Sequence, residues 1–279
     1  MWDNQLQHHL QVRPHNYFKY YFNIIFYGLA PTILHIWVTQ ASFDITMGGP
    51  TAFVVGHSFV RRYASWIGHH HMAPKRARDI CTSYSDIRFL GHSGLNSEQL
   101  HSGDILFQAT KHDIVVIDCG TNDIANDVSQ QQIANNILLF ACRCLQDGVA
   151  VVYILSVLPR SRRISGSPEE FRRKVQAFND HMKSLCVKEN DITFCRQNGF
   201  MNIDCPNNHQ VACWSDDGIH PSTRCRHQHN KSGMEKYHQS IKSALHRAFH
   251  RYRHINKVNQ WFNIYSNPNW FTTTKILMT

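Results

Sequence analysis

The chain has 279 residues, of which 42% are hydrophobic and 18% are charged. This apolar content is enough for one full hydrophobic core, and it excludes a disordered or a fibrous protein. The 29 lysines and arginines outnumber the 20 acidic residues, so that the formal net charge is +9. We therefore expect a basic surface on the folded protein.

An uncharged, largely apolar stretch occupies residues 20–38, close to the length of about 20 residues that crosses a membrane. Arg13 and Lys19 precede it as in a signal sequence, and Thr39-Gln40-Ala41 resembles a cleavage site. Polar residues and a proline inside the stretch argue against both functions. The extension at residues 1–46 is therefore a signal-anchor, a cleaved signal peptide, an apolar segment on the domain or sequence upstream of a true start at Met47. The location of the protein depends on which of these holds, and it stays open between membrane-anchored, secreted and cytoplasmic.

Short apolar runs alternate with helical patterns from Thr51 onward. Their near-continuous Val, Ile and Phe content is typical of strands that are covered on both faces, whereas a half-exposed strand alternates apolar and polar residues. We predict five strands, at residues 51–55, 87–90, 114–118, 149–155 and 192–195. Strands that alternate with helices predict an α/β protein with a parallel sheet.

Three helices have clear signals in the sequence. One begins after Ser129, has apolar residues at helical spacing and ends at Gly148. The second begins at residues 167–170, Ser-Pro-Glu-Glu, which offer an N-cap hydroxyl, a proline at the first helical position and a capping-box glutamate. The last runs from about Met234 to Phe249, where the periodicity is lost.

These patterns divide the chain into three parts. They are the extension at residues 1–46, one domain at residues 47–249, and a basic, aromatic tail at residues 250–279. The part from 246 to 279 contains lysines and arginines but no acidic residue. Such a run can meet phosphate or an anionic membrane, although it is more often a solvated face.

An open parallel sheet gathers its ligand-binding groups on the loops just past the carboxyl ends of its strands. Four segments have this character: Gly56-His57-Ser58-Phe59, Gly91-His92-Ser93-Gly94, Gly120-Thr121-Asn122-Asp123 and Asp216-Asp217-Gly218-Ile219-His220-Pro221. Each supplies one kind of group that acyl transfer needs.

A serine becomes a nucleophile when a base takes its proton and a carboxylate orients the base. Ser58, His220 and Asp217 are candidates for these roles, because a carboxylate three residues before a histidine can fold back onto the imidazole through a tight turn. The oxyanion of the transition state needs hydrogen-bond donors. The backbone N–H groups of Ser58 and Gly94 and the side-chain amide of Asn122 are the candidates.

In order and content, the four segments resemble the conserved blocks of the SGNH (GDSL-type) hydrolases, and GHSFVRR and DDGIHPS resemble an uncharacterised animal branch of that family. The resemblance covers about residues 48–249. It implies a three-layer α/β/α, flavodoxin-like fold with a five-stranded parallel sheet in the order 2-1-3-4-5. It implies Ser58 as nucleophile, His220 as general base and Asp217 as its orienting acid, with Gly94 and Asn122 in the oxyanion hole. No metal and no organic cofactor are implied.

One position departs from the family pattern, because most members have Asp where this chain has His57. The exchange changes the local geometry and charge around Ser58 rather than the identity of the nucleophile. Two interpretations stay open. A protonated His57 would favour an anion beside Ser58, whereas a neutral His57 would hydrogen-bond a loop.

The nine cysteines form no CxxC pair, so that no disulfide framework can be predicted. One stretch has spacing similar to that of metal ligands, but it lacks the repeated close pairs of a closed zinc site. Its residues are Cys205, His209, Cys213, Cys225, His227 and His229. We therefore expect no metal site.

Two functions fit the sequence. The first is a serine esterase, a monomer that acts on small-molecule or acylated substrates. The second is a catalytically weak or inactive domain of the same fold that binds nucleic acid or an acylated polymer, which the charge of +9 and His57 favour. The membrane is a further candidate partner, through residues 20–38.

Overall fold

The computed structural model of the chain describes residues 49–68, 83–160, 164, 166–189, 191–197, 214–223 and 232–266, with side chains as far as Val258 in the last range. The chain divides after Met47 into two units, and all described residues belong to the second. The apolar stretch at residues 20–38 lies outside the described residues, and the three-part division of the chain stays a prediction. None of the helices in the described ranges has the length and apolar character to span a membrane.

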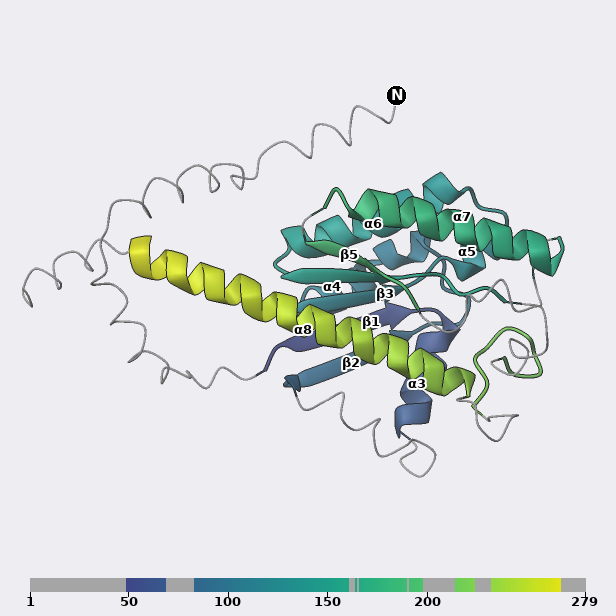
Figure 1. Cartoon of the computed structure of the whole chain (residues 1–279), viewed down its shortest axis with the longest axis horizontal. Helices are drawn as coiled ribbons and strands as arrows, with labels where there is room; N and C mark the ends of the chain where they lie inside the picture. Colours follow the sequence, from purple (N-terminus) through teal and green to yellow (C-terminus); the bar gives the residue numbers. More distant parts are fainter. Residues whose placement is uncertain are drawn as a thin grey trace, which may run out of the picture. The chain divides into compact units, whose positions relative to one another are not determined.

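A five-stranded, wholly parallel sheet forms the centre of the domain (Figure 1). Its strands are β1 (Thr51–Gly56), β2 (Asp86–Gly91), β3 (Ile114–Asp118), β4 (Val151–Leu155) and β5 (Ile192–Cys195). They lie in the order β2-β1-β3-β4-β5 and pair in parallel throughout. The predicted fold class and strand order are confirmed, and each strand lies within two residues of its predicted bounds.

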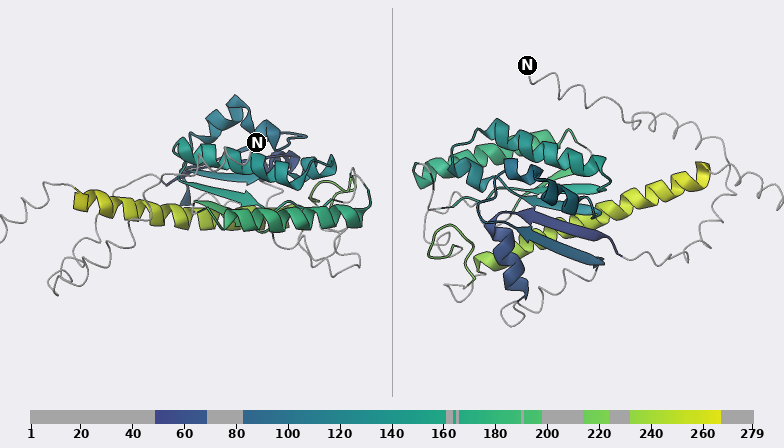
Figure 2. Two further views of the ribbon diagram at one scale, coloured as in Figure 1. Left: turned by 90° about the horizontal axis from the view of Figure 1, so that it is seen from above. Right: turned by 180° about the vertical axis from the view of Figure 1, so that it is seen from behind.

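Helices cover both faces of the sheet (Figure 2). One face carries α3 (Ser58–Gly68) and α8 (Gly233–Ser266). The other carries η4 (Glu98–His101), α4 (Gly103–Ala109), α5 (Thr121–Ala125), α6 (Gln130–Gln146) and α7 (Pro168–Cys186). Both sides of each inner strand therefore face apolar side chains, which explains the continuous apolar runs in the sequence.

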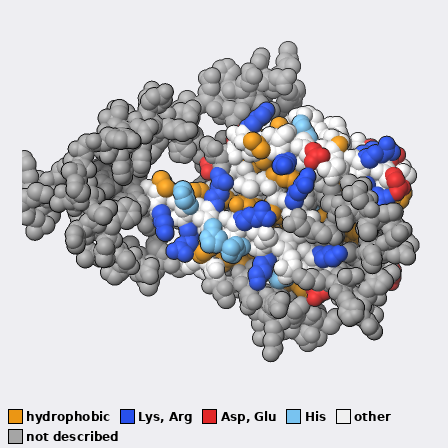
Figure 3. All heavy atoms as spheres, viewed as in Figure 1, with side chains coloured by type: hydrophobic (Ala, Val, Ile, Leu, Met, Phe, Trp, Pro, Cys, Tyr) orange, Lys and Arg blue, Asp and Glu red, His pale blue; other side chains and the backbone are white. Residues whose placement is uncertain are grey.

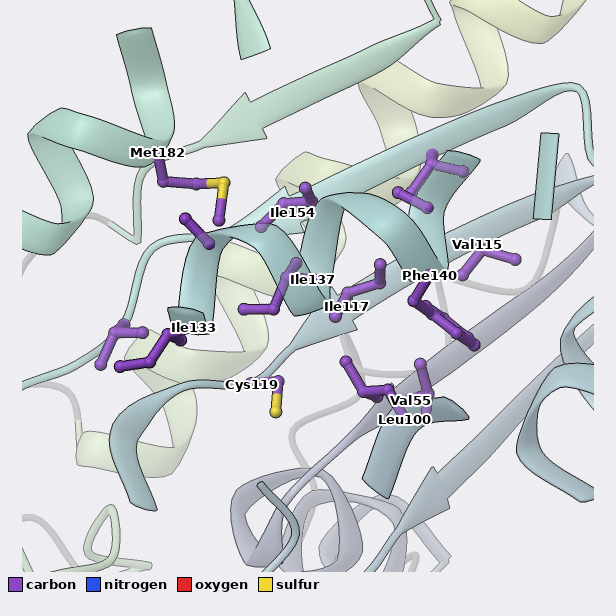
Figure 4. Packing of buried hydrophobic residues seen from close by; sticks show 14 of the residues in the cluster. Val55, Leu100, Val115, Ile117, Cys119, Ile133, Ile137, Phe140, Ile154 and Met182 are labelled. Atoms are coloured by element: carbon purple, nitrogen blue, oxygen red, sulfur yellow. The ribbon is translucent and has the colours of Figure 1, made fainter. Parts of the chain in front are cut away.

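Alternate residues of each strand enter two separate cores. In β1, Ala52 and Val54 pack toward α3 and α8, whereas Phe53 and Val55 pack toward the opposite helices. Figure 4 shows the second core, in which side chains of α6 lie beside those of β3 and β4. The labelled residues there include Ile133, Ile137, Phe140, Ile117 and Ile154. The three layers hold the strand ends in place, and the polar loops leave from these ends.

The capping signals act as the sequence predicts. The hydroxyl of Ser129 accepts a hydrogen bond from the backbone N–H of Gln132 at 3.2 Å, and α6 begins at Gln130. The hydroxyl of Ser167 accepts one from the backbone N–H of Glu170 at 3.1 Å, ahead of α7. Both caps satisfy donors that have no partner within the helix.

The last helix is longer than predicted, and its predicted end at Phe249 is wrong, because α8 continues to Ser266. The reason lies in long-range contacts. Phe249, Tyr252 and Ile255 pack against the core at a spacing of three residues. The hydroxyl of Tyr252 also donates to Asp113 Oδ1 at 3.2 Å, just before β3. These contacts stabilise a helix whose sequence is rich in polar and aromatic residues.

The exposed side of α8 carries part of the predicted basic surface. On the face seen in Figure 3, Lys, Arg and His side chains gather along this helix. Its exposed basic and histidine residues from 246 onward are His246, Arg247, His250, Arg253, His254 and Lys257. After Glu235 the helix contains no acidic residue that could neutralise them.

Two glycines allow close approaches of the backbone at the strand ends. A Cβ atom at Gly91 would lie 2.1 Å from the backbone nitrogen of Arg61, and one at Gly56 would lie 2.3 Å from the carbonyl oxygen of Asp118. Both distances are far below van der Waals contact, and the atoms met are backbone atoms, which cannot rotate away. Glycine at position 91 therefore lets the first turn of α3 lie against the end of β2, and glycine at position 56 lets the end of β1 lie close to the backbone of β3.

Gly91→Ala is expected to lower the free energy of unfolding by about 3 kcal/mol, toward the upper end of the usual cost of overpacking. Urea denaturation measures the change. Gly103→Ala is the matched control, because a Cβ there would meet no atom within 4 Å, and we expect a change below about 1 kcal/mol. Equal stability of the two variants would contradict the close approach of α3.

Candidate functional site

The register of the sheet brings three polar loops to one level. Gly56, the last residue of β1, is level with the last residues of β2 and β3. Ser58, Gly94 and Asn122 follow these three strand ends after two, three and four residues. The backbone N–H of His92 also donates to the carbonyl oxygen of Gly56 at 3.0 Å, which joins two of the loops.

Ser58, His220 and Asp217 lie in one chain of hydrogen bonds. His220 Nε2 lies 2.9 Å from Ser58 Oγ, and His220 Nδ1 lies 2.6 Å from Asp217 Oδ2. An ionised Asp217 can only accept, so that Nδ1 carries the proton and Nε2 is left to accept from the serine hydroxyl. The residues come from the first turn of α3 and from a loop far along the chain, and the structure brings together all three that the sequence singled out.

The loop around His220 is built on the second oxygen of Asp217. Asp217 Oδ1 accepts from the backbone N–H groups of Ile219 at 2.9 Å and His220 at 3.0 Å, and from the hydroxyl of Ser215 at 2.5 Å. Gly218 adopts a φ of 63°, a conformation that glycine adopts without strain. Because Oδ1 is occupied by the loop, Oδ2 faces the imidazole ring.

The surroundings favour the ionised form of Asp217 and the neutral form of His220. Burial raises the pKa of Asp217, but hydrogen bonds from Ser215, His220 and Ile219 outweigh burial and hold the pKa well below its usual value. Burial lowers the pKa of His220; Asp217 opposes this effect, and the positive charge of Arg62 adds to it. The net pKa of His220 lies below its usual value. At neutral pH the site therefore combines an anionic carboxylate with a neutral imidazole.

Arg62 is a residue of the site that sequence reasoning missed. It stands one turn after Ser58 in α3, and its Nη2 lies 3.4 Å from Asp217 Oδ2. The side chains of Arg62 and Asp217 are 43% and 35% exposed, so that solvent weakens their attraction. The spacing of four residues from Ser58 was the available signal, because residues four apart share a helix face.

Hydrogen-bond donors lie in the loops next to Ser58. No residue in the described ranges accepts a hydrogen bond from the backbone N–H of Ser58 or of Gly94. The side-chain Nδ2 of Asn122 donates to the carbonyl oxygen of Leu95 at 2.8 Å, which leaves its second N–H available. Gly94 has a φ of 78°, where other residues are strained. These groups are the predicted donors to an oxyanion.

Asp123 connects the loops after β2 and β3. Its buried carboxylate accepts from the backbone N–H of Ser97 at 2.9 Å and from the hydroxyl of Ser97 at 2.7 Å. Asn136 of α6 donates to the same hydroxyl at 3.1 Å. The segments that carry Gly94 and Asn122 are thereby joined through a cluster of hydrogen bonds, which restricts their relative movement.

His57 precedes Ser58 in the chain and is 2% exposed. Its Nδ1 accepts from the backbone N–H of Phe59 at 3.4 Å, and its Nε2 lies 3.6 Å from Asp118 Oδ1. His57 therefore contacts its own loop through Nδ1 and the buried Asp118 through Nε2. This arrangement favours the interpretation in which His57 hydrogen-bonds its own loop.

Asp118 is the buried partner that the sequence analysis missed. It is 1% exposed, and its carboxylate accepts from the hydroxyl of Tyr237 at 2.5 Å and from Gln197 Nε2 at 3.5 Å. Burial and the charge of Asp118 raise the pKa of Tyr237 well above its usual value, so that the phenol stays a donor. The available signal was an acidic residue within an otherwise apolar strand.

Metal binding finds no support in the described part of the chain, where no group of three or more His, Cys, Asp or Glu residues could hold an ion. The cysteine and histidine stretch between Cys205 and His229 lies outside the described residues, except at residues 214–223.

His57→Asp, which introduces the residue most common in the family, is expected to destabilise the protein. It would bury a second carboxylate beside Asp118, and an uncompensated buried charge costs about 3–5 kcal/mol. The loss should shrink as the pH falls and one carboxyl group takes a proton. Urea denaturation at several pH values measures it. The double variant His57→Asp/Asp118→Asn should recover much of the loss; a single variant as stable as the original chain would contradict the argument.

Two solved structures share the fold of this chain. The acetylxylan esterase Axe2 from Geobacillus stearothermophilus, solved as a catalytic mutant, is 12% identical, with 71% of this chain and 94% of that chain covered and a TM-score of 0.53. A G-D-S-L family protein from Desulfitobacterium hafniense DCB-2 is 14% identical, with 70% of this chain and 99% of that chain covered and a TM-score of 0.50. At these identities the likeness shows a common fold.

A model of the GDSL-like lipase/acylhydrolase family matches residues 53–225, whereas none of the curated proteins matches the chain. The matched region begins in β1, extends past the loop of His220 and covers more than half of the sequence. It confirms the resemblance that the four polar segments indicate. The chain therefore belongs to the GDSL-like lipase/acylhydrolase family and is a hydrolase that acts on esters.

Proposed function

We propose that the protein is a serine esterase in which Ser58 is the nucleophile, His220 the general base and Asp217 the acid that orients the base. The observation that supports this most directly is the chain of hydrogen bonds from Ser58 Oγ to His220 at 2.9 Å and from His220 to Asp217 at 2.6 Å. The lowered pKa of His220 adds support, because a base must be neutral before it can take a proton.

In the first half of the reaction, Ser58 Oγ attacks the carbonyl carbon of the ester while its proton passes to His220 Nε2. The carbonyl oxygen becomes an anion, which in this proposal the N–H groups of Ser58, Gly94 and Asn122 stabilise. The tetrahedral intermediate collapses, His220 donates its proton to the departing alcohol, and an acyl-serine remains.

In the second half, water attacks the acyl-serine and gives its proton to His220. The second tetrahedral intermediate releases the carboxylic acid, and the proton returns to Ser58. Asp217 stays ionised throughout and stabilises the imidazolium that forms in each half. The same residue types support this assignment in the acetylxylan esterase of the same fold, whose catalytic mutants exchange a serine and an aspartate for alanine.

The basic side of α8 favours a second function, the binding of a polyanion such as nucleic acid. Tyr252 contacts Asp113, which lies just before β3. Arg251 contacts Asp191, which lies just before β5. This part of α8 therefore lies at the opposite ends of the strands from Ser58. A binding surface there would leave the esterase site open, so that the two functions do not exclude each other.

Ser58→Ala is expected to lower the rate of hydrolysis of p-nitrophenyl acetate or butyrate by at least about 10³-fold and to abolish labelling by a fluorophosphonate. Ser65→Ala is the matched control, because Ser65 lies two turns further along α3, is exposed and donates to the carbonyl oxygen of Arg61. It should leave both readouts unchanged. If the original chain and Ser58→Ala are equally inert on all esters, the proposed function is wrong.

The acid limb of the pH profile of kcat/KM is expected to have its midpoint below about 6.5, the usual pKa of histidine. Protonated His220 cannot act as a base, so that activity falls as the pH drops through its pKa. Arg62→Gln removes a positive charge that lowers this pKa, and the midpoint should move to higher pH. Arg61→Gln removes the same charge from an exposed neighbour and should leave the midpoint in place. A midpoint unmoved by Arg62→Gln would contradict the role of Arg62.

A further inference from the structure

The side-chain amide of Asn122 is held at both ends. Nδ2 donates to the carbonyl oxygen of Leu95 at 2.8 Å, and Oδ1 accepts from the guanidinium group of Arg160 at 3.2 Å. Turning the amide over would place its NH2 group against the guanidinium and its oxygen against the carbonyl, which are two repulsive contacts. The two neighbours therefore fix one orientation, in which a single Nδ2–H remains for a ligand.

Arg160 is itself held in place. It follows β4, and the residue is 9% exposed. The backbone of Val157 exchanges two hydrogen bonds with the side chain of Asn179 in α7, at 2.8 and 3.0 Å. The guanidinium carbon lies 5.8 Å from the centre of the Phe171 ring, within range of a cation–π contact. The guanidinium is thus supported by a buried segment and by α7.

We infer that Arg160 is a positioning residue for the proposed reaction. Its guanidinium group holds and polarises the side chain of Asn122 as a donor to the oxyanion. The inference rests on the proposed function. A cation that donates to the amide oxygen draws electron density from the amide group, which strengthens its N–H as a donor. Arg160 thus acts on the reacting atoms through Asn122.

This role predicts a particular kinetic signature. The oxyanion carries full charge only near the transition state, so that a better-positioned donor raises kcat and changes KM little. Arg160→Met removes both the donor and the charge and should lower kcat about 10- to 100-fold, somewhat less than the roughly 10²- to 10³-fold loss of one oxyanion donor. Arg160→Gln keeps a donor and Arg160→Lys keeps the charge, and each should recover part of the activity.

A double-mutant cycle with Asn122→Ala tests whether Arg160 acts through Asn122. In the Asn122→Ala background, Arg160→Met should lower kcat by less than about twofold, because the group that it positions is absent. Arg196→Met is the matched control. Arg196 follows β5, is 62% exposed and lies 3.5 Å from Asp180, and its replacement should leave kcat and KM unchanged. Thermal unfolding of each full-length variant shows that it is folded.

Additive losses of kcat in the cycle, or a rise of KM with unchanged kcat in Arg160→Met, would overturn the inference, because Arg160 would then act on the substrate directly. A readout without activity separates this outcome from failure of the proposed function. In ¹⁵N NMR spectra, Arg160→Met should shift the side-chain amide resonances of Asn122, whereas Arg196→Met should not. Unshifted resonances overturn the inference even if hydrolysis by Ser58 is established, and shifted ones support the contact even if hydrolysis is absent.

Discussion

The candidate site depends on three neighbouring strands that end side by side in the sheet. Because β1 pairs in parallel with both β2 and β3, with Gly56 level with Gly91 and Asp118, the loops that follow start from one line across the sheet. The missing side chain at Gly91 lets the first turn of α3 reach that line without a clash. Ser58 is therefore placed by the main chain, and its position does not depend on the rotamers of surrounding side chains.

The polar groups under the site are charged acceptors that are satisfied by neutral donors. Asp118 accepts from a phenol and an amide, and Asp123 accepts from a backbone N–H and a hydroxyl. Such hydrogen bonds are directional, and each donor is itself fixed by a helix or a loop, so that the carboxylates hold the loops at defined distances. The guanidinium groups of Arg62 and Arg160 contact other acceptors, the carboxylate of Asp217 and the amide oxygen of Asn122.

Much of the fold could be predicted from the sequence, because the decisive signals are local. Strands covered on both faces have continuous apolar runs, and Ser129 and Ser167 have the side chains that cap helices. Three of the four polar segments likewise follow their strands directly, whereas the fourth lies in a loop well after β5. Ser58, Asp217 and His220 could be named because each lies in a short motif whose order along the chain is informative.

The remaining features depend on contacts between distant segments. The extension of α8 past Phe249 depends on Asp113 and on the outer edge of the core, which no local period reveals. Arg160 and Ser215 are ordinary polar residues in loops, and their importance comes only from the atoms that they meet. His57 is the intermediate case, since the sequence shows that it is unusual but only the fold shows that Asp118 lies beside it.

The order in which the elements occur along the chain has a consequence for biosynthesis. The sheet and the helices on one of its faces are complete by Cys195, but His220 and α8 follow later. The backbone N–H of Met234, at the start of α8, donates to Ser222 at 2.9 Å, so that this helix also anchors the loop of His220. Until the ribosome has released α8, the part of the other face that α8 covers remains open to water and chaperones, and His220 has no fixed place beside Ser58.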